Sequence, residues 1–329
     1  MADLTRWGII GCGNIARKFA TGLQSADSAV LKAVGSRSAQ KAEAFGSEFS
    51  AEHRHGSYEA LVADPDVDVI YVATPHPMHK QNSILCLQGG KAVLCEKPFT
   101  INAEQAKEVV AVAKSQGRFL MEAMWSRFLP AAQQLRDWIT SGAIGEVRMV
   151  QADFGYRCAW NPKLRSLDPQ LGGGALLDVG VYPISLAVMV FGSVPARITG
   201  MAHLGETGVD EQAAVVFGYD DGRLALLSTA VRTETAHEAQ IMGTEGRIHL
   251  ASSWWRSSTM TLHRPGKEPE IVDPPRKGNG YNYEAEAVGR CLREGKLESA
   301  LMPLDETVRV MQTMDEIRSQ WGLKYPMEA

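Results

Sequence analysis

Glycines near the start of the chain are spaced to approach a phosphate group. An apolar segment, residues 7–10, runs directly into Gly11-Cys12-Gly13-Asn14-Ile15-Ala16. In this GxGxxA pattern the first glycine permits a tight turn, the second lets a pyrophosphate approach the backbone, and the last residue lets a helix pack closely on its strand. The N–H groups that begin the helix would then face the phosphates. We therefore expect a dinucleotide site at residues 11–15, with Cys12 as a small residue beside the ligand in preference to a reactive thiol.

The end of the next predicted strand indicates which dinucleotide would fit. About 20 residues beyond the glycines, a carboxylate would bind the ribose hydroxyls of NAD, but this chain reads Val34-Gly35-Ser36-Arg37-Ser38. The missing acid removes repulsion of a 2′-phosphate, Arg37 offers a bidentate donor, and the two serines offer hydroxyls. Lys41, one helical turn on, could add a second cation. We expect NADP in preference to NAD; the alternative is that Arg37 is only a solvated loop residue.

A lysine follows a further apolar segment, in Val93-Leu94-Cys95-Glu96-Lys97-Pro98. If this segment is a strand of an open α/β sheet, Lys97 lies at the carboxyl edge, where ligands bind. Pro98 disfavours helical geometry at Lys97 and fixes the turn, so the ammonium group is held in place. The position of the strand end, the neighbouring acid and the proline together favour a functional lysine over a surface one.

A β-sheet is needed to position these residues. The first third of the chain has the alternating strand and helix pattern that predicts such a sheet. Residues 7–10, 30–34, 67–73 and 92–95 read as strands, and residues 15–23, 40–49, 79–88 and 103–115 read as helices. The alternation is typical of βαβ units in a parallel sheet. We expect a doubly wound Rossmann domain that binds the dinucleotide over residues 1–122.

The pattern changes after residue 121. A helix is expected at residues 131–140, and β-rich segments follow at residues 147–156, 197–204, 213–219, 224–231, 238–242, 247–250 and 260–263. The turn signals between them are typical of an antiparallel meander, and helices near residues 283–294 and 304–320 close the chain. We expect residues 123–329 to form an α+β domain on an open antiparallel sheet, which binds substrate and mediates dimerisation. The fold class is therefore α/β in the first domain and α+β in the second.

Composition excludes several classes of protein. The 329 residues include 34 basic and 38 acidic side chains, for a formal charge of −4, so no excess of cations exists to neutralise a nucleic acid backbone. No stretch reaches about 18 uninterrupted apolar residues, so we expect no membrane span. The five cysteines are scattered without metal-ligand spacing, which favours a reducing compartment and a cytoplasmic location.

Four motifs, taken in order, resemble those of the glucose-fructose oxidoreductase, inositol dehydrogenase and rhizopine catabolism (Gfo/Idh/MocA) family across nearly the whole chain. They are residues 11–16, Thr74-Pro75-His76-Pro77-Met78-His79, residues 90–98, and the segment Gly172-Gly173-Gly174-Ala175-Leu176-Leu177-Asp178-Val179-Gly180-Val181-Tyr182. Residues 56–59, 120–128 and 206–210 are similar to the dimeric dihydrodiol dehydrogenases and NADP-dependent D-xylose dehydrogenases of that family.

The resemblance implies that Lys97 is the catalytic lysine and that Tyr182 is the acid/base residue. Oxidation of an alcohol carbon needs a base for the hydroxyl proton, and a phenol, with an ordinary pKa of about 10, needs a nearby cation to serve near neutrality. Asp178 would share a helix face with Tyr182 and orient a substrate hydroxyl or Lys97, although Pro183 would kink that helix. Without the motif, Asp178 reads as a helix N-cap and Tyr182 as a half-buried aromatic. Similar turns also imply a cis Lys97–Pro98 peptide bond.

The same resemblance places further side chains beside the cofactor. They are Thr74, Pro75, His76, His79 and Glu96. Metal binding by His76 and His79 is the alternative, but no acid or third ligand is spaced to complete a site there, so we expect no metal.

Aromatic faces suit the C–H groups of a sugar or an arene ring, so aromatic residues outside the first motifs are candidate substrate walls. The candidates, which include one neighbouring arginine, are Trp125, Arg127, Phe154, Tyr156 and the pair Trp254-Trp255. Some aromatic residues of this kind belong to the core or to a dimer interface instead.

Together these observations predict an NADP-dependent oxidoreductase that acts on a sugar or cyclic polyol. The substrate would be an aldose such as D-xylose, oxidised at its anomeric carbon, or a trans-dihydrodiol. The alternatives are an NADPH-dependent keto-sugar reductase and a non-catalytic NADP-binding sensor. Residues 213–217 and 224–227 are apolar at both odd and even positions, which indicates strands whose two faces are both covered. We therefore expect a homodimer through the C-terminal sheet.

Overall fold

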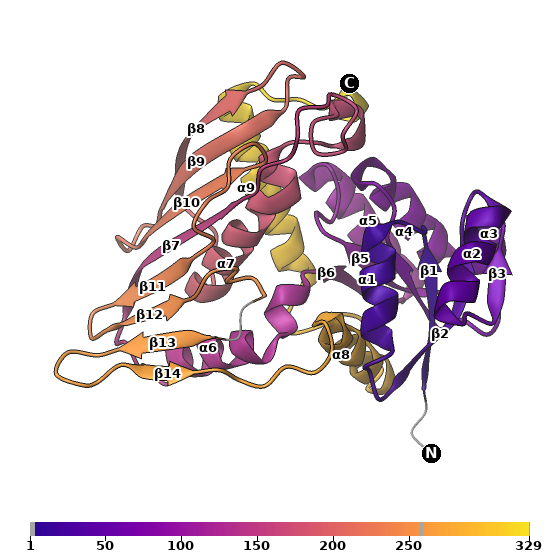
Figure 1. The fold of residues 1–329 in the computed structure, drawn as a ribbon, viewed down its shortest axis with the longest axis horizontal. Helices are drawn as coiled ribbons and strands as arrows, with labels where there is room; N and C mark the ends of the chain where they lie inside the picture. The colour runs from indigo at the N-terminus through magenta and orange to yellow at the C-terminus, as the bar shows by residue number, and fades with distance from the viewer. Residues whose placement is uncertain (1–3, 257–258, 329) are drawn as a thin grey trace. The chain divides into compact units, whose positions relative to one another are not determined.

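The computed structural model describes residues 4–256 and 259–328. The chain packs as two compact units (Figure 1). Unit 1 contains the residues up to Phe128 together with Arg276–Val308, and unit 2 contains Leu129–Pro275 together with the residues from Arg309 onward. The division of function between residues 1–122 and 123–329 stays a prediction; the packing units differ from it in that residues 276–308 return to unit 1.

A six-stranded parallel sheet forms the centre of unit 1, with the strand order β3-β2-β1-β4-β5-β6. Its strands are β1 (Thr5–Ile10), β2 (Ala29–Gly35), β3 (His53–His55), β4 (Val69–Val72), β5 (Ala92–Glu96) and β6 (Leu120–Ala123). The connecting helices are α1 (Asn14–Leu23), α2 (Ala39–Phe49), α3 (Tyr58–Val62), α4 (His79–Gln88) and α5 (Ala103–Gln116). This is the Rossmann arrangement that the alternating pattern predicts.

Burial and capping explain why these segments form these elements. Every residue of β4 and β5 is buried, as expected for central strands of a parallel sheet that helices cover on both faces. Helices α2, α3 and α5 begin at polar caps: the side chains of Ser38, Ser57 and Asn102 accept hydrogen bonds from backbone N–H groups three residues later. The two weakest sequence signals, β3 and β6, are also the two edge strands.

A late segment of the chain completes unit 1. Helix α8 (Tyr281–Arg293) packs against α1 and against the short helix η2 (Trp125–Phe128). Trp125 stacks on Tyr281 with ring centroids 4.7 Å apart. Arg127 forms an ion pair with Glu306, in the first turn of α9 (Leu304–Trp321). The predicted boundary at residue 122 places these two residues at the start of the second domain, whereas they pack in unit 1. Both are buried by contacts with residues more than 150 positions later.

An eight-stranded sheet forms unit 2, in the order β14-β13-β12-β11-β7-β10-β9-β8. The strands are β7 (Val147–Gly155), β8 (Arg197–Leu204), β9 (Asp210–Gly218), β10 (Leu224–Ala230), β11 (Ala239–Gly243), β12 (Arg247–Leu250), β13 (Met260–His263) and β14 (Glu270–Val272). Helices α6 (Pro130–Thr140) and α7 (Val181–Phe191) belong to this unit (Figure 1). The strands alternate buried and exposed residues, as sheets with one covered face do.

One strand pair departs from the expected antiparallel meander. β7 and β10 are parallel, with Val150 opposite Ala225, whereas the other strand pairs described in this sheet are antiparallel. Parallel neighbours need a long crossover, and α7, β8 and β9 lie in the chain between these two strands. The sheet is thus mixed but mostly antiparallel.

A buried apolar helix runs through unit 2. Residues Pro169–Phe191 are long and apolar enough to cross a membrane by length and composition, but 94% of the most apolar window is buried inside the protein. Within this segment α7 packs against β7 and β10. A helix that is apolar all round is expected in a protein core as well as in a membrane, and here the protein itself covers it.

Candidate active site

The glycine loop of unit 1 has the geometry that a bound pyrophosphate needs. Gly11 has φ +99°, and a Cβ there would lie 2.8 Å from the carbonyl oxygen of Ala73, so the fold itself demands glycine. Gly13 has an ordinary φ of −82°, and a Cβ there would meet nothing within 4 Å in the described part of the chain. Glycine at position 13 is therefore explained by a group from outside the chain, and Gly13 also leaves the N-terminus of α1 without a side-chain cap.

The turn after β2 and the start of α2 carry two serines and two exposed cations. The Ser36 hydroxyl accepts the backbone N–H of Ser38 at 3.2 Å, and the Ser38 hydroxyl accepts that of Lys41 at 3.3 Å. The serines thus shape the turn, while Arg37 and Lys41 stand exposed beside it. Burial raises the pKa of the Cys12 thiol, although Ser36, Arg17 and Lys41 act to lower it. A raised pKa argues against a reactive thiolate in the loop.

The turn after β5 holds Lys97, and the Lys97–Pro98 peptide bond is cis, which confirms the expectation. The His79 side chain contacts this turn and the loop after β4. Its Nδ1 lies 2.9 Å from the carbonyl oxygen of Pro98, and its Nε2 lies 2.8 Å from that of Thr74. Thr74 receives a further hydrogen bond, from the Asn82 amide at 3.1 Å. Both nitrogens of this fully buried imidazole are therefore engaged with the ends of β4 and β5. His76 is buried beside it, with ring centroids 5.7 Å apart.

Glu96, which precedes Lys97 in the chain, and Glu284 are both buried carboxylic acids. Only Glu96 is predicted from the sequence as a site residue. Glu96 accepts hydrogen bonds from the Lys97 N–H at 3.1 Å and from the Tyr71 hydroxyl. Glu284 of α8 has no hydrogen-bond partner for either carboxyl oxygen among the described residues. Burial raises the pKa of Glu96 to about 7, against the lowering effect of Lys97 and Tyr71. Burial and the neighbouring Glu96 raise the pKa of Glu284 well above its ordinary value.

In unit 2 a wide helical turn precedes α7 and carries Asp178. Residues Leu176–Gly180 form a π-helical turn, η4, and α7 follows directly with Tyr182 as its second residue. Pro183 has no N–H to continue the hydrogen-bond ladder, and a π turn is one way in which a helix absorbs such a break. Pro183 lies in the first turn of α7, directly after the π-helical turn. Asp178 and Tyr182 are both buried on this turn.

Three hydrogen bonds anchor the backbone that leads into this turn. The Asp210 carboxylate accepts the Leu176 N–H at 2.6 Å. The Thr229 hydroxyl donates to the carbonyl oxygen of Ala175 at 3.2 Å, and the Tyr325 hydroxyl donates to that of Gly173 at 2.6 Å. The Asp178 and Tyr182 positions are therefore set by residues from β9, β10 and the C-terminal segment.

Tyr156 and Arg165 of unit 2 donate hydrogen bonds to the Asp178 carboxylate. The Tyr156 hydroxyl donates to Asp178 Oδ2 at 2.6 Å, and Arg165 Nη2 donates to Oδ1 at 2.9 Å. Burial raises the pKa of Tyr156, and the negative charge of Asp178 raises it further, so Tyr156 remains a protonated donor. Arg165 was not predicted, since a lone arginine in an irregular segment carries no sequence signal. Its cation balances the buried carboxylate.

Aromatic rings gather around the predicted acid/base residue. Phe154 of β7 lies 5.3 Å from Tyr182 between ring centroids, and it stacks on Trp255 at 3.4 Å. Trp254 points its indole N–H at the carbonyl oxygen of Asp153, 2.8 Å away. Of the predicted wall residues, the structure thus brings Phe154 to Tyr182 and Tyr156 to Asp178, whereas Trp254 supports the strand that carries Phe154.

The other two predicted wall residues have structural partners in unit 1. Trp125 is 6% exposed and Arg127 is 4% exposed. Arg127 also donates to the carbonyl oxygen of Leu301 at 3.4 Å, besides its ion pair with Glu306. A role for either residue in substrate binding stays a prediction, and their contacts with α8 and α9 already account for their burial.

Comparison with known proteins identifies relatives over the full chain. A family profile described as an oxidoreductase family with an NAD-binding Rossmann fold matches residues 5–124, and a GFO/IDH/MocA C-terminal domain profile matches residues 132–249. A protein named trans-1,2-dihydrobenzene-1,2-diol dehydrogenase from Xenopus tropicalis is 39% identical, over 98% of this chain and 99% of its own length. The protein of that name from Homo sapiens is 36% identical, over 98% of both chains.

Solved structures share the fold. A 3-ketoreductase from Actinomadura kijaniata, in complex with NADP and TDP-benzene, has a TM-score of 0.84 at 26% identity and covers 96% of this chain and 98% of its own. An aldose-aldose oxidoreductase from Caulobacter crescentus, complexed with glycerol, has a TM-score of 0.89 at 22% identity and covers 97% of this chain and 98% of its own. The second likeness concerns the fold alone.

The buried acid behind Lys97 predicts a pH dependence of stability. The folded-state pKa of Glu96, about 7, exceeds the ordinary 4.5, so the stability that its protonated form contributes is present below pH 4.5 and is lost as the pH rises through 7. The loss amounts to about 3 kcal/mol in unfolding free energy. Glu96→Gln, which cannot ionise, should reduce the decline measured by denaturant unfolding between pH 5 and 8.5. The exposed Glu268→Gln is the control, and equal declines in all three proteins would contradict the expectation.

Proposed function

Because this chain belongs to the Gfo/Idh/MocA family of NAD(P)-dependent oxidoreductases, we propose that it transfers reducing equivalents between NADP and an alcohol carbon of a sugar or cyclic diol. The observation that carries the proposal is the turn after β5, which holds Lys97 at the carboxyl edge of the sheet that also bears the glycine loop. The relatives named as dihydrodiol dehydrogenases support a diol, and an aldose such as D-xylose stays the second candidate substrate.

The residues divide the chemistry between them. When bound, the dinucleotide accepts or supplies the hydride. Tyr182 takes the hydroxyl proton as the carbonyl forms and returns it in the opposite direction. The Lys97 ammonium favours the ionised phenol and binds the substrate oxygen. Asp178, oriented by Tyr156 and Arg165, accepts a hydrogen bond from a second substrate hydroxyl. Phe154 offers an aromatic face to the substrate ring.

A second candidate function is the reduction of a keto-sugar by NADPH. The 3-ketoreductase from Actinomadura kijaniata, which shares 26% identity, favours it. The same residues would act in the opposite direction, with Tyr182 as the acid. Absorbance changes at the nicotinamide band with a panel of diols, aldoses and keto-sugars distinguish the two functions, and a protein that binds NADPH but turns over none of them would be a sensor instead.

We propose NADP in preference to NAD on the basis of the β2 end. Arg37 and Lys41 are exposed there, and neither a buried acid nor an exposed one occupies residues 34–38. A 2′-phosphate would neutralise both cations, whereas NAD would leave them unused.

The cofactor preference is tested by removing one of these cations. Arg37→Ala should weaken NADPH binding by about 1 to 3 kcal/mol, the range of a charge-assisted hydrogen bond, and should change NADH binding little. Fluorescence titration of the two cofactors measures this difference, with Arg247→Ala, an exposed arginine of β12, as the control. Wild-type protein that binds NADH as tightly as NADPH would refute the preference.

Catalytic roles are tested by a double-mutant cycle. Tyr182→Phe should retain NADPH binding and lose about 100-fold or more in turnover, the scale of general acid–base catalysis. The turnover of Lys97→Met should fall by at least as much. The turnover of the double variant should fall by much less than the product of the two single effects, because Lys97 acts largely through the phenol. Asp178→Asn should be milder, since an amide still hydrogen-bonds a hydroxyl. If Tyr182→Phe keeps near wild-type kcat/KM and its basic pH limb, the proton goes to another group.

We further propose that the chain forms a homodimer through the exposed face of the unit 2 sheet. Met201 of β8 is 82% exposed, Val216 of β9 is 43% exposed and Leu226 of β10 is 39% exposed. Val216 pairs with Leu226 across the ladder, and Met201 pairs with Ala214. An apolar face on neighbouring strands of a sheet fits a second copy of the same surface.

Sedimentation at micromolar concentration tests the dimer. Val216→Lys combined with Leu226→Lys should convert the protein to a monomer, because two buried ammonium groups per copy would be desolvated in the interface. Ile271→Lys, which places the same charge on the exposed edge strand β14, should leave the dimer intact. A wild-type monomer would exclude this interface.

A cytoplasmic location is part of the same proposal. The five cysteines are free, and Cys86 and Cys95 are buried with pKa values raised by desolvation, so they are inert as thiols. Free cysteines of this kind fit a reducing compartment.

A further inference from the structure

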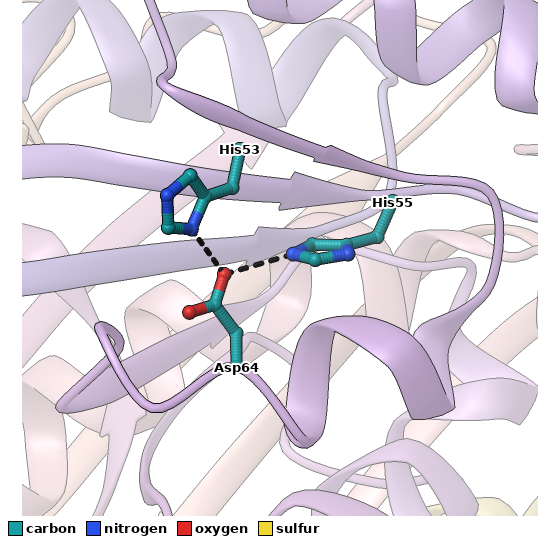
Figure 2. Close-up of side chains that lie close together, drawn as sticks. All are labelled: His53, His55 and Asp64. Carbon is teal, nitrogen blue, oxygen red and sulfur yellow. Dashed lines mark hydrogen bonds and ion pairs between the residues drawn. The ribbon is translucent and has the colours of Figure 1, made fainter.

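Two histidines and one aspartate of unit 1 converge at the edge strand β3, apart from the residues described above. His53 and His55 begin and end this strand, and their spacing of two places both side chains on one face of the sheet. Asp64 follows α3 and points toward the same place (Figure 2). Asp64 Oδ2 lies 2.6 Å from His53 Nδ1 and 2.8 Å from His55 Nε2.

This cluster combines a fixed anion with two accessible imidazoles. The Asp64 side chain is 2% exposed, and those of His53 and His55 are 31% and 23% exposed. Asp64 Oδ1 accepts the backbone N–H of Asp66 at 2.9 Å, which leaves Oδ2 facing the two rings.

We propose that His53 Nδ1, His55 Nε2 and Asp64 Oδ2 bind a divalent transition-metal ion of the zinc class. All three ligand atoms lie within 4.8 Å of one another. Two imidazole nitrogens and one carboxylate oxygen are a common ligand set for zinc, with water in the fourth position. Magnesium and calcium prefer oxygen-only sites, so the two nitrogens select against them.

The surroundings support ion binding over a purely structural hydrogen-bond network. A zinc ligand contributes a ring nitrogen without its proton, so His53 would carry its proton on Nε2 instead of Nδ1. Two carboxylates lie near that nitrogen at ion-pair distance, beyond hydrogen-bond range: Glu52 Oε1 lies 3.8 Å and Asp66 Oδ2 lies 3.9 Å from His53 Nε2. Zinc–ligand bonds of about 2 Å require the ligand atoms to separate to about 3.3 Å, and half-exposed histidine rings can turn by that amount.

The ion would also act on the neighbouring strand. The His55 carbonyl oxygen accepts the backbone N–H of Ser36 at 3.1 Å, and Gly35 pairs with His55 in the β2–β3 ladder. A bound ion would therefore join β3, the segment after α3 and, through β3, the turn that bears Arg37.

Metal retention and spectroscopy test this site in the full-length protein. After treatment with EDTA and dialysis against ZnCl2, the wild type should retain one equivalent of zinc by elemental analysis. Loading with Co²⁺ instead should give the intense visible absorption of a four-coordinate ion. His53→Ala and His55→Ala, both at half-exposed positions, should each weaken zinc binding at least tenfold and remove the cobalt band.

Controls separate this site from adventitious binding. His203→Ala replaces an exposed histidine of β8 and should leave both signals unchanged. Asp64→Asn should also lose the ion, but the buried position makes the two histidine variants the decisive ones. The proposal is overturned if the wild type fails to retain zinc. It is also overturned if the His53→Ala/His55→Ala double variant retains zinc equally.

Discussion

The buried imidazole of His79 joins the ends of two central strands, and the placement of Lys97 depends on it. Its two nitrogens face the carbonyl oxygens of Thr74 and Pro98, so one ring spans the loops after β4 and β5. Burial lowers the pKa of His79, while the two carbonyls act to raise it. A neutral ring can donate to only one of the two oxygens, so the bridge is a compromise between burial and hydrogen bonding.

In unit 2 a buried carboxylate, Asp210, fixes the backbone of the loop that leads to Asp178. Asp210 accepts the N–H of Leu176 at the start of the turn that bears Asp178, and burial raises the pKa of Asp210 to about 7. Gly174 adjoins it with φ +108°, and a Cβ there would overlap Asp210 Oδ1. The glycine-rich segment therefore serves close packing around a buried acid. In both units a buried polar side chain fixes the backbone of a loop. That loop in turn positions the residues proposed to contact substrate.

The sequence predicts most of the fold because its signals are local. Apolar runs, caps and the GxGxxA loop each lie within about a dozen residues, and the helices and central strands of unit 1 appear where these signals indicate. The weak predictions concern contacts between distant segments. Glu284 meets Glu96 across nearly 190 positions, and Asp64 meets His53 from a different element. The contacts of Trp125 with α8 and of Arg127 with α9 also could not be read from the sequence. A hydrophobic pattern fixes which face is buried, but it does not say which later segment covers that face.

The return of residues 276–308 to unit 1 has a consequence for how the protein is made. During synthesis the ribosome releases the strands and helices of the first 128 residues long before α8 exists. Until then Trp125 lacks Tyr281, Arg127 lacks Glu306, and the apolar face of α1 that α8 covers is exposed. Domains often fold in order from the N-terminus as they emerge. In this protein the first unit to be started is completed only after nearly the whole chain has been translated, so part of its core stays uncovered for most of synthesis.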